Sequence, residues 1–268
     1  MSEAIGQPGG ATLPRPMGIG EILSTAWQLY RRHWRTLLGI AALVVVPLSL
    51  LQAGLGAAVR TQGETTREGV VVTTATWAVG FASLLAALAA ILMWVVLTGA
   101  ITRAVAAEVV GEDPSVEQSY RFGFHRLGSV LLVGILVALA TIAGFIVFVI
   151  PGIYIAVRLA VSVEALVVEG RRGTEAMRRS WDLVAGQWWH AFGTLVVTAL
   201  LVGIVSSVIS APFGATNWFG QGLASAVAEV LTMPYSVLVG VLLYLDLRSR
   251  KEQLTLETLR ADLQASAA

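Results

Sequence analysis

The sequence contains no cysteine, and only 13% of its 268 residues are charged. The absence of thiols excludes disulfide bonds, a thiol nucleophile and cysteine-ligated zinc or iron–sulfur sites. Soluble domains carry about 25% charged residues, so this chain has roughly half of the usual charge. A net charge of +1 supplies no positive field for nucleic acid. We therefore expect neither a nucleic-acid partner nor cysteine-based chemistry.

Apolar residues make up 56% of the chain, and the mean hydropathy is +0.76. One globular core of this size cannot bury so much apolar surface, whereas a lipid bilayer can surround it. A membrane-spanning helix needs about 20 apolar residues. The runs that qualify are residues 36–58, 74–101, 127–150, 152–168, 189–211 and 223–245. The sequence thus predicts an all-α, polytopic membrane protein with about six transmembrane helices, arranged as three hairpins.

The predicted membrane domain, residues 18–250, is flanked by two polar segments. Residues 1–17 form a tail rich in glycine and proline that we expect to be disordered. Because this tail precedes the first apolar run, we expect that run to be a retained span rather than a cleaved signal peptide. In residues 251–268, Leu256, Leu259 and Leu263 recur at helical spacing. This spacing predicts an amphipathic cytoplasmic helix.

The third and fourth apolar runs meet at Ile150-Pro151-Gly152, a turn signal that predicts a helical hairpin. The fourth run departs most from a simple span, because it contains Arg158 and Glu164. Whether residues 152–168 cross the bilayer completely therefore stays open at this stage.

Basic residues alternate between the two ends of the predicted spans. Lysine and arginine near a span favour the cytoplasmic side. One side has Arg60 and Arg67 only, beside Glu64 and Glu68. The other side has Arg15, Arg31, Arg32, Arg35, Arg103, Arg121, Arg126, Arg171, Arg172, Arg178, Arg179, Arg248, Arg250, Lys251 and Arg260. This asymmetry predicts a multi-pass protein of the bacterial cytoplasmic membrane with both termini in the cytoplasm.

Aromatic residues mark a short stretch before spans one, three and five. Trp27 precedes Trp34 by seven residues, and Trp181 precedes Trp188 by the same interval. Seven residues are about two helical turns, so each pair falls on one helix face. Trp and Tyr favour the headgroup level of a membrane. We therefore predict amphipathic cytoplasmic helices whose interfacial anchors are Trp27, Trp34, Tyr120, Trp181, Trp188 and Trp189.

These stretches suggest three units of one surface helix plus two spans, over residues 18–110, 114–170 and 173–248. Chance matches among the aromatic belts of an ordinary membrane protein are the alternative.

Several short motifs resemble a known bacterial family. They are Val168-Glu169-Gly170, the run EAMRRSWDL from Glu175 to Leu183, and the ending LYLDLRSRKE over residues 243–252. The early GEIL at residues 20–23 and YRRHW at residues 30–34 fit the same pattern. Together they resemble the integral membrane family named after the membrane domain of glycerophosphoryl diester phosphodiesterase. The resemblance implies a multi-span helical protein, but not the phosphodiesterase reaction, which belongs to a separate catalytic domain that this chain lacks.

Arg158 and Glu229 are the most informative charges within the predicted spans. Each lies seven residues from the outer end of its span, at a depth of about 10 Å. Because an unpaired charge at that depth is costly, we predict that the two form an ion pair. The pair is either a structural clamp or part of a polar path for an anionic substrate. Glu164, in the same span as Arg158, is expected to reach the interface or Arg103.

The three histidines, His33, His125 and His190, lie at the cytoplasmic entrances of spans. Without i,i+4 partners or nearby carboxylates they favour interfacial anchoring over a metal site. We expect no metal and no cofactor.

Four cytoplasmic arginines could bind anionic lipid headgroups. They are Arg171, Arg172, Arg178 and Arg179.

The sequence contains no nucleophile–base pair, metal-ligand cluster or phosphate loop, and so predicts no enzyme. The favoured function is a scaffold or accessory factor for envelope or lipid homeostasis, with the bilayer, anionic lipids and other membrane proteins as partners. The alternative is a small transporter or channel subunit with a polar path at Arg158 and Glu229.

Overall fold

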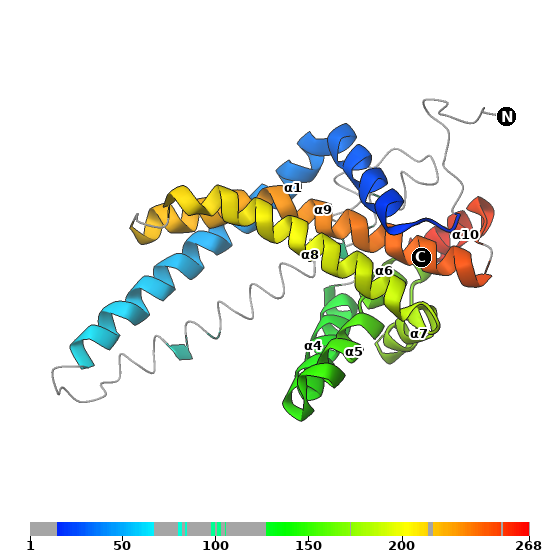
Figure 1. Ribbon diagram of the computed structural model, residues 1–268, viewed down its shortest axis with the longest axis horizontal. Helices are drawn as coiled ribbons and strands as arrows, with labels where there is room; N and C mark the ends of the chain where they lie inside the picture. Colours follow the sequence, from blue (N-terminus) through cyan, green and yellow to red (C-terminus); the bar gives the residue numbers. More distant parts are fainter. Residues whose placement is uncertain are drawn as a thin grey trace.

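The computed structural model describes residues 15–66, 80–81, 84, 98–99, 101–102, 105, 127–171, 173–213, 217–252 and 254–267. Every regular element among these residues is a helix, which confirms the all-α class (Figure 1). The elements are α1 Ile19–Thr66, α4 Leu127–Val147, α5 Val149–Arg158, α6 Ser162–Glu169, α7 Thr174–Val184, α8 Trp188–Ser210, the 3-10 helix η1 Ala211–Phe213, α9 Trp218–Glu252 and α10 Leu256–Ala267.

Within the described residues, four segments are long and apolar enough to cross a membrane. They are Gly128–Val147, Val149–Glu169, Trp188–Phe213 and Phe219–Glu252. They overlap the predicted third, fourth, fifth and sixth apolar runs, whereas the predicted first run, residues 36–58 in α1, is not among them. Most of the predicted second run, and Tyr120 and His125 of the second surface helix, lie outside the described residues.

Helix α1 changes direction at His33, whose φ of −115° and ψ of 21° are not helical. The bend separates a first leg, residues 19–32, from a long second leg, residues 34–66 (Figure 1). It falls three residues before the predicted start of the first span. Helix α1 continues through the bend without a loop, and the predicted surface helix before the first span stays a prediction.

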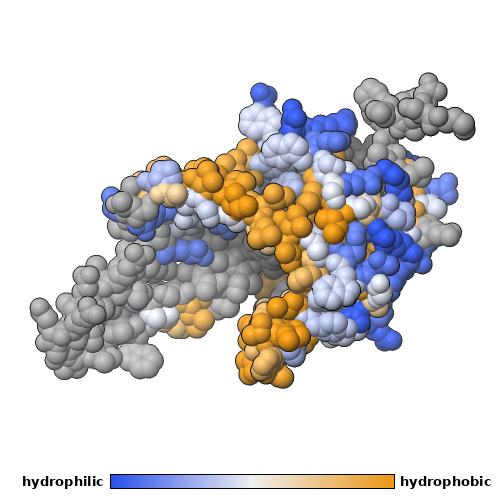
Figure 2. Space-filling view, in the orientation of Figure 1, coloured by the Kyte–Doolittle hydropathy of each residue, from blue (hydrophilic) through white to orange (hydrophobic). Residues whose placement is uncertain are grey.

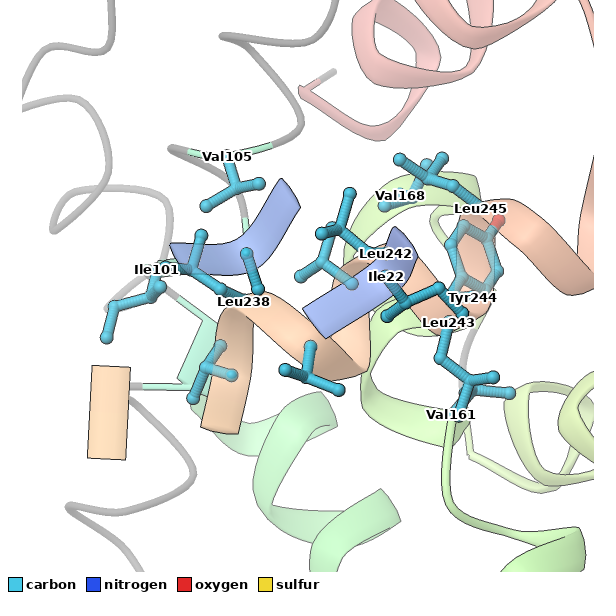
Figure 3. Packing of buried hydrophobic residues seen from close by; sticks show 14 of the residues in the cluster. Ile22, Ile101, Val105, Val161, Val168, Leu238, Leu242, Leu243, Tyr244 and Leu245 are labelled. Carbon is cyan, nitrogen blue, oxygen red and sulfur yellow. The ribbon is translucent and has the colours of Figure 1, made fainter. Parts of the chain in front are cut away.

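Helix α9 forms the centre of the packing, with α1 and α8 along its sides. Residues 241–249 of α9 are buried on every face, as expected for a helix surrounded by other helices. One buried cluster joins Ile22 of α1, Val161 just before α6, Val168 of α6, and Leu238 and Leu242 of α9 (Figure 3).

Helices α4 and α5 form a tight antiparallel hairpin. The connecting residue is Phe148, in an extended conformation with φ −173° and ψ 160°. A Cβ added to Gly144 would lie 3.0 Å from the Cα of Gly152, so the two helices meet backbone to backbone. The turn therefore lies at Phe148, three residues before the predicted position at Pro151. Pro151 lies in the first turn of α5, where the missing N–H of proline breaks no helical hydrogen bond.

The predicted fourth span is not one continuous helix, because α5 ends at Arg158 and α6 begins at Ser162. The hydroxyl of Ser180, in α7, makes hydrogen bonds to backbone groups on both sides of this interruption. It accepts a hydrogen bond from the Val161 N–H at 3.3 Å and donates one to the Arg158 carbonyl at 2.9 Å. Backbone groups that the break frees from the helix are therefore still paired.

Candidate functional site

Charged side chains gather where the ends of α6 and α9 meet α7 and α10. Glu169, at the end of α6, is the centre of this group. Its Oε1 accepts hydrogen bonds from Arg179 Nε and from the Tyr244 hydroxyl, both at 2.7 Å. Its Oε2 accepts one from Arg171 Nε at 2.7 Å. One carboxylate therefore joins α6, α7 and α9.

Arg248 of α9 extends the group to α10. Its Nη2 donates to Asp262 Oδ2 at 2.5 Å and its Nε to Glu252 Oε2 at 3.1 Å. The side chains of both Glu169 and Arg248 are only 6% exposed. We refer to Glu169, Arg171, Arg179, Arg248, Glu252 and Asp262 as the charged cluster.

Arg179 links the two halves of the charged cluster, since its Nη2 also donates to Glu252 Oε2 at 2.7 Å. Burial alone would lower the pKa of Arg179, but hydrogen bonds to Glu252 and Glu169 raise this pKa above its ordinary value. The guanidinium therefore stays charged. In Figure 2 hydrophilic surface gathers at this end of the molecule.

A second buried group holds the starts of α1 and α8 against α9. The Asp246 side chain is fully buried and accepts a hydrogen bond from the Met17 N–H at 2.6 Å. Arg250 Nε donates to the same carboxylate at 2.9 Å, and Arg250 Nη2 donates to the Met17 carbonyl at 2.6 Å. His190 Nε2 lies 2.9 Å from Asp246 Oδ2, without hydrogen-bond geometry. The His190 ring therefore packs against the buried Asp246 carboxylate, which interfacial anchoring alone does not describe.

The structure does not bring Arg158 and Glu229 together, so the predicted ion pair is wrong. Arg158 Nε donates to the Tyr154 hydroxyl at 3.0 Å and Nη1 to the Trp181 carbonyl at 2.7 Å. Glu229 instead accepts a hydrogen bond from Ser49 Oγ at 3.3 Å, in α1. A depth counted along each helix does not tell which helices are neighbours: α5 packs mainly on α4, whereas Glu229 of α9 faces α1.

Glu164 is buried and does not reach solvent. Its Oε1 would lie 2.8 Å from a Cβ placed on Gly240, so the carboxylate packs tightly on the α9 backbone. Its Oε2 has no hydrogen-bond partner among the described residues. The predicted partner Arg103 lies outside those residues.

The predicted aromatic anchors divide into exposed and packed residues. Trp189 is 77% exposed, and Trp27, Trp34 and Trp181 are also exposed. Trp188 stacks on Tyr154, with ring centroids 5.9 Å apart. Tyr120 lies outside the described residues.

The first leg of α1 lies along α9. Trp27 stacks on Tyr30, and both rings contact Tyr235 of α9. The Tyr30 hydroxyl donates to the Leu231 carbonyl at 2.9 Å. Tyr235 precedes the predicted end of the last span by ten residues, about 15 Å along the helix. Trp27 therefore packs beside the middle of α9, and not at the level of its charged end.

Three of the four predicted lipid-binding arginines line one cavity of about 320 Å³, and Arg172 lies outside the described residues. The lining residues are Arg171, Glu175, Arg178, Arg179 and Asp182. Because Arg171 and Arg179 already bind Glu169, and two further acids line the cavity, its attraction for an anion is weakened.

Among the described residues no group of three His, Asp or Glu side chains could hold a metal ion. Sequence reasoning missed both charged groups as units. Their i,i+4 spacings, Arg248–Glu252 in the charged cluster and Asp246–Arg250 in the second group, are visible in the sequence.

In comparisons with known proteins, no family model, curated protein or solved structure matches this chain. The resemblance noted in the sequence thus stays a prediction, and the structure alone carries the argument about function.

Proposed function

We propose that this chain is a multi-pass protein of the bacterial cytoplasmic membrane that acts as a non-enzymatic scaffold or accessory factor. One observation carries the proposal: charged side chains at one end of the molecule are paired between helices, while its long helices expose apolar surface. Leu200, Ile204 and Val208 of α8 are each more than half exposed. Apolar helix faces of this size need lipid around them. The paired charges hold α6, α7, α9 and α10 as one rigid platform beside that lipid.

The proposed topology places this charged platform and both termini in the cytoplasm, because the arginines and the lysine that flank the spans favour that side. Anionic lipid headgroups remain proposed contacts of Arg178, which is exposed in the 320 Å³ cavity. Membership of the family that the sequence resembles would fit a role in envelope or lipid homeostasis.

The transporter alternative has less support. It requires a cavity that leads to Arg158 or Glu229. Neither residue lines the cavity of about 470 Å³ or the cavity of about 320 Å³ that described residues form. The larger, about 470 Å³, has an apolar and aromatic lining that includes Trp27, Tyr30 and Tyr235. Arg158 is instead held between the rings of Tyr154 and Trp181. A guanidinium that already contacts two aromatic rings acts as an anchor and is less available to bind a transported anion.

Reconstitution tests the transporter alternative. The purified full chain would be placed in liposomes loaded with dyes that report protons, potassium or chloride. A scaffold should give the same leak as protein-free liposomes. Flux that Arg158→Gln abolishes, with folded protein unchanged, would overturn the scaffold proposal in favour of transport.

Photocrosslinking in cells tests the scaffold role directly. A photoreactive residue would replace Glu257, which is exposed on α10, and a control would replace Leu200, which faces outward from α8. We expect an adduct of discrete mass from position 257 and only lipid adducts from position 200. Absence of any protein adduct from position 257 would contradict an accessory role for this platform.

A further inference from the structure

The α4–α5 hairpin ends in a tip without any polar side chain. Ile146, Val147, Phe148, Val149 and Ile150 are consecutive, and all are strongly exposed, Ile146 at 80% and Ile150 at 72%. We call residues 146–150 the hairpin tip. Figure 1 shows the hairpin projecting away from the α8–α9 pair, and Figure 2 shows hydrophobic surface gathered at its end. Water is an unfavourable surrounding for such a surface.

The projecting part of the hairpin ends where its side chains begin to pack on the rest of the protein. In α4, Val130 and Val133 are buried against α6 and α7, and Val137 is the last residue that packs on this cluster. From Val137 to the end of α4 is ten residues, about 15 Å. In α5, Ile153 already packs on the main core, four residues and about 6 Å from Val149. The hydrocarbon core of a bilayer is about 30 Å thick, so the projecting part is no longer than one leaflet.

An aromatic cluster marks the base of the projecting part. The ring of Tyr154, in α5, lies 5.9 Å from Trp181 of α7 and 5.9 Å from Trp188 of α8. Arg158 lies 4.6 Å from the Trp181 ring. Aromatic rings and arginines of this kind favour the headgroup level of a membrane.

The same aromatic cluster is the starting point of α8. That helix extends 23 residues from Trp188, about 35 Å, which is enough to cross the bilayer. Phe148, by contrast, lies only six residues from Tyr154, about 9 Å along α5. If α8 crosses from this level, the hairpin tip cannot reach the opposite surface.

The backbone of the turn suits an apolar surrounding. The Phe148 N–H donates to the Gly144 carbonyl at 3.0 Å, and the Gly152 N–H to the Phe148 carbonyl at 3.2 Å. Pro151 has no N–H to satisfy. Two backbone N–H groups of the turn are therefore paired, which lowers the cost of placing the turn in hydrocarbon.

We propose that the α4–α5 hairpin is re-entrant: its tip inserts among the acyl chains of the leaflet nearest to Trp188 and does not cross. The proposal rests on the proposed membrane location of the chain. It replaces two of the six expected spans by a wedge in one leaflet. Because the hairpin enters and leaves on the same side, the orientation of α8 and α9 is unchanged.

Single cysteines can test this in the full chain, which has none of its own. Phe148→Cys, and separately Ile150→Cys, would carry an environment-sensitive fluorophore in vesicles of phosphatidylcholine and phosphatidylglycerol. Nitroxide-labelled lipid would be added to one leaflet at a time. We expect severalfold stronger quenching from the leaflet that contains the α7 side than from the other leaflet. An impermeant maleimide should fail to label either cysteine.

Two controls separate the possible failures. Leu200→Cys on α8 reports whether the chain lies in the bilayer at all, and loss of quenching there would overturn the membrane location itself. Ala211→Cys, exposed in η1 beyond α8, marks the opposite surface. If Leu200→Cys is quenched but the tip is labelled like Ala211→Cys, the hairpin crosses and the proposal fails. A tip that is quenched from neither leaflet is covered by protein, and this also overturns the proposal.

Discussion

The charged cluster and the hairpin tip are stabilised by opposite means. In the charged cluster, Glu169 and Arg248 are almost completely buried and each contacts side chains from other helices. In the hairpin tip, apolar side chains project outward. Buried ions are favourable only when each has its partner, whereas exposed apolar groups need only a suitable solvent. The comparison shows that one region is stabilised within the protein and the other by its surroundings.

Ser180 and Arg158 connect these two regions. Ser180 lies in α7 next to Arg179 of the charged cluster, and its hydroxyl holds the break that follows α5. Arg158, at the end of α5, donates a hydrogen bond to the Trp181 carbonyl and so fixes the base of the hairpin to α7. A rigid platform and a projecting apolar hairpin are therefore joined through one short helix, α7.

The largest effect is expected at the centre of the charged cluster. Arg248→Ala leaves Asp262 without its arginine and removes one positive charge beside the buried carboxylate of Glu169. Removal of one partner of a buried ion pair costs about 3–5 kcal/mol. We expect the free energy of unfolding, measured by denaturant in detergent micelles, to fall by about that amount.

Arg178→Ala is the matched control, because Arg178 is exposed on α7. Exposed substitutions change stability by about 0.5 kcal/mol or less. Equal losses for Arg178→Ala and Arg248→Ala would mean that the charged cluster contributes no specific stability.

A medium effect is expected where α4 meets α5. A Cβ on Gly144 would lie 2.9 Å from Ile155 Cδ1 and 3.0 Å from the Gly152 Cα, and a backbone atom cannot rotate away. Gly144→Ala should therefore lower the free energy of unfolding by about 1–3 kcal/mol, as overpacked cores do. In Gly203→Ala of α8, nothing lies within 4 Å of the new Cβ. That variant should be neutral or stabilising by about 1 kcal/mol. A neutral Gly144→Ala would show that the hairpin is loosely packed.

The sequence predicted the helical class and the apolar segments that overlap four of its six expected spans, because apolar composition and length act locally. It failed for Arg158 and Glu229, because a depth counted along each helix does not tell which helices are neighbours. It also missed the break after α5, which is supported by Ser180, 22 residues further along the chain from Arg158. The charged cluster was also missed as a unit, since its members come from α6, α7, α9 and α10. These failures concern contacts between helices, which spacing along one helix does not encode.

The smallest effect is expected at the hairpin tip, where Ile146→Ala should change the free energy of unfolding in micelles by about 0.5 kcal/mol or less. Ile146 is 80% exposed, so its truncation removes few contacts within the protein. Val133→Ala, in the buried part of the same helix, should lower it by about 2 kcal/mol, because two buried methyl groups are lost and a cavity is left. The contrast within α4 tests whether the apolar tip belongs to the core. If Ile146→Ala lowered the free energy of unfolding as much as Val133→Ala, the tip would be packed on protein in the folded molecule. It would then be stabilised by contacts within the protein, as the charged cluster is. A near-zero effect leaves lipid as the surrounding that accounts for five consecutive apolar side chains at the end of a hairpin.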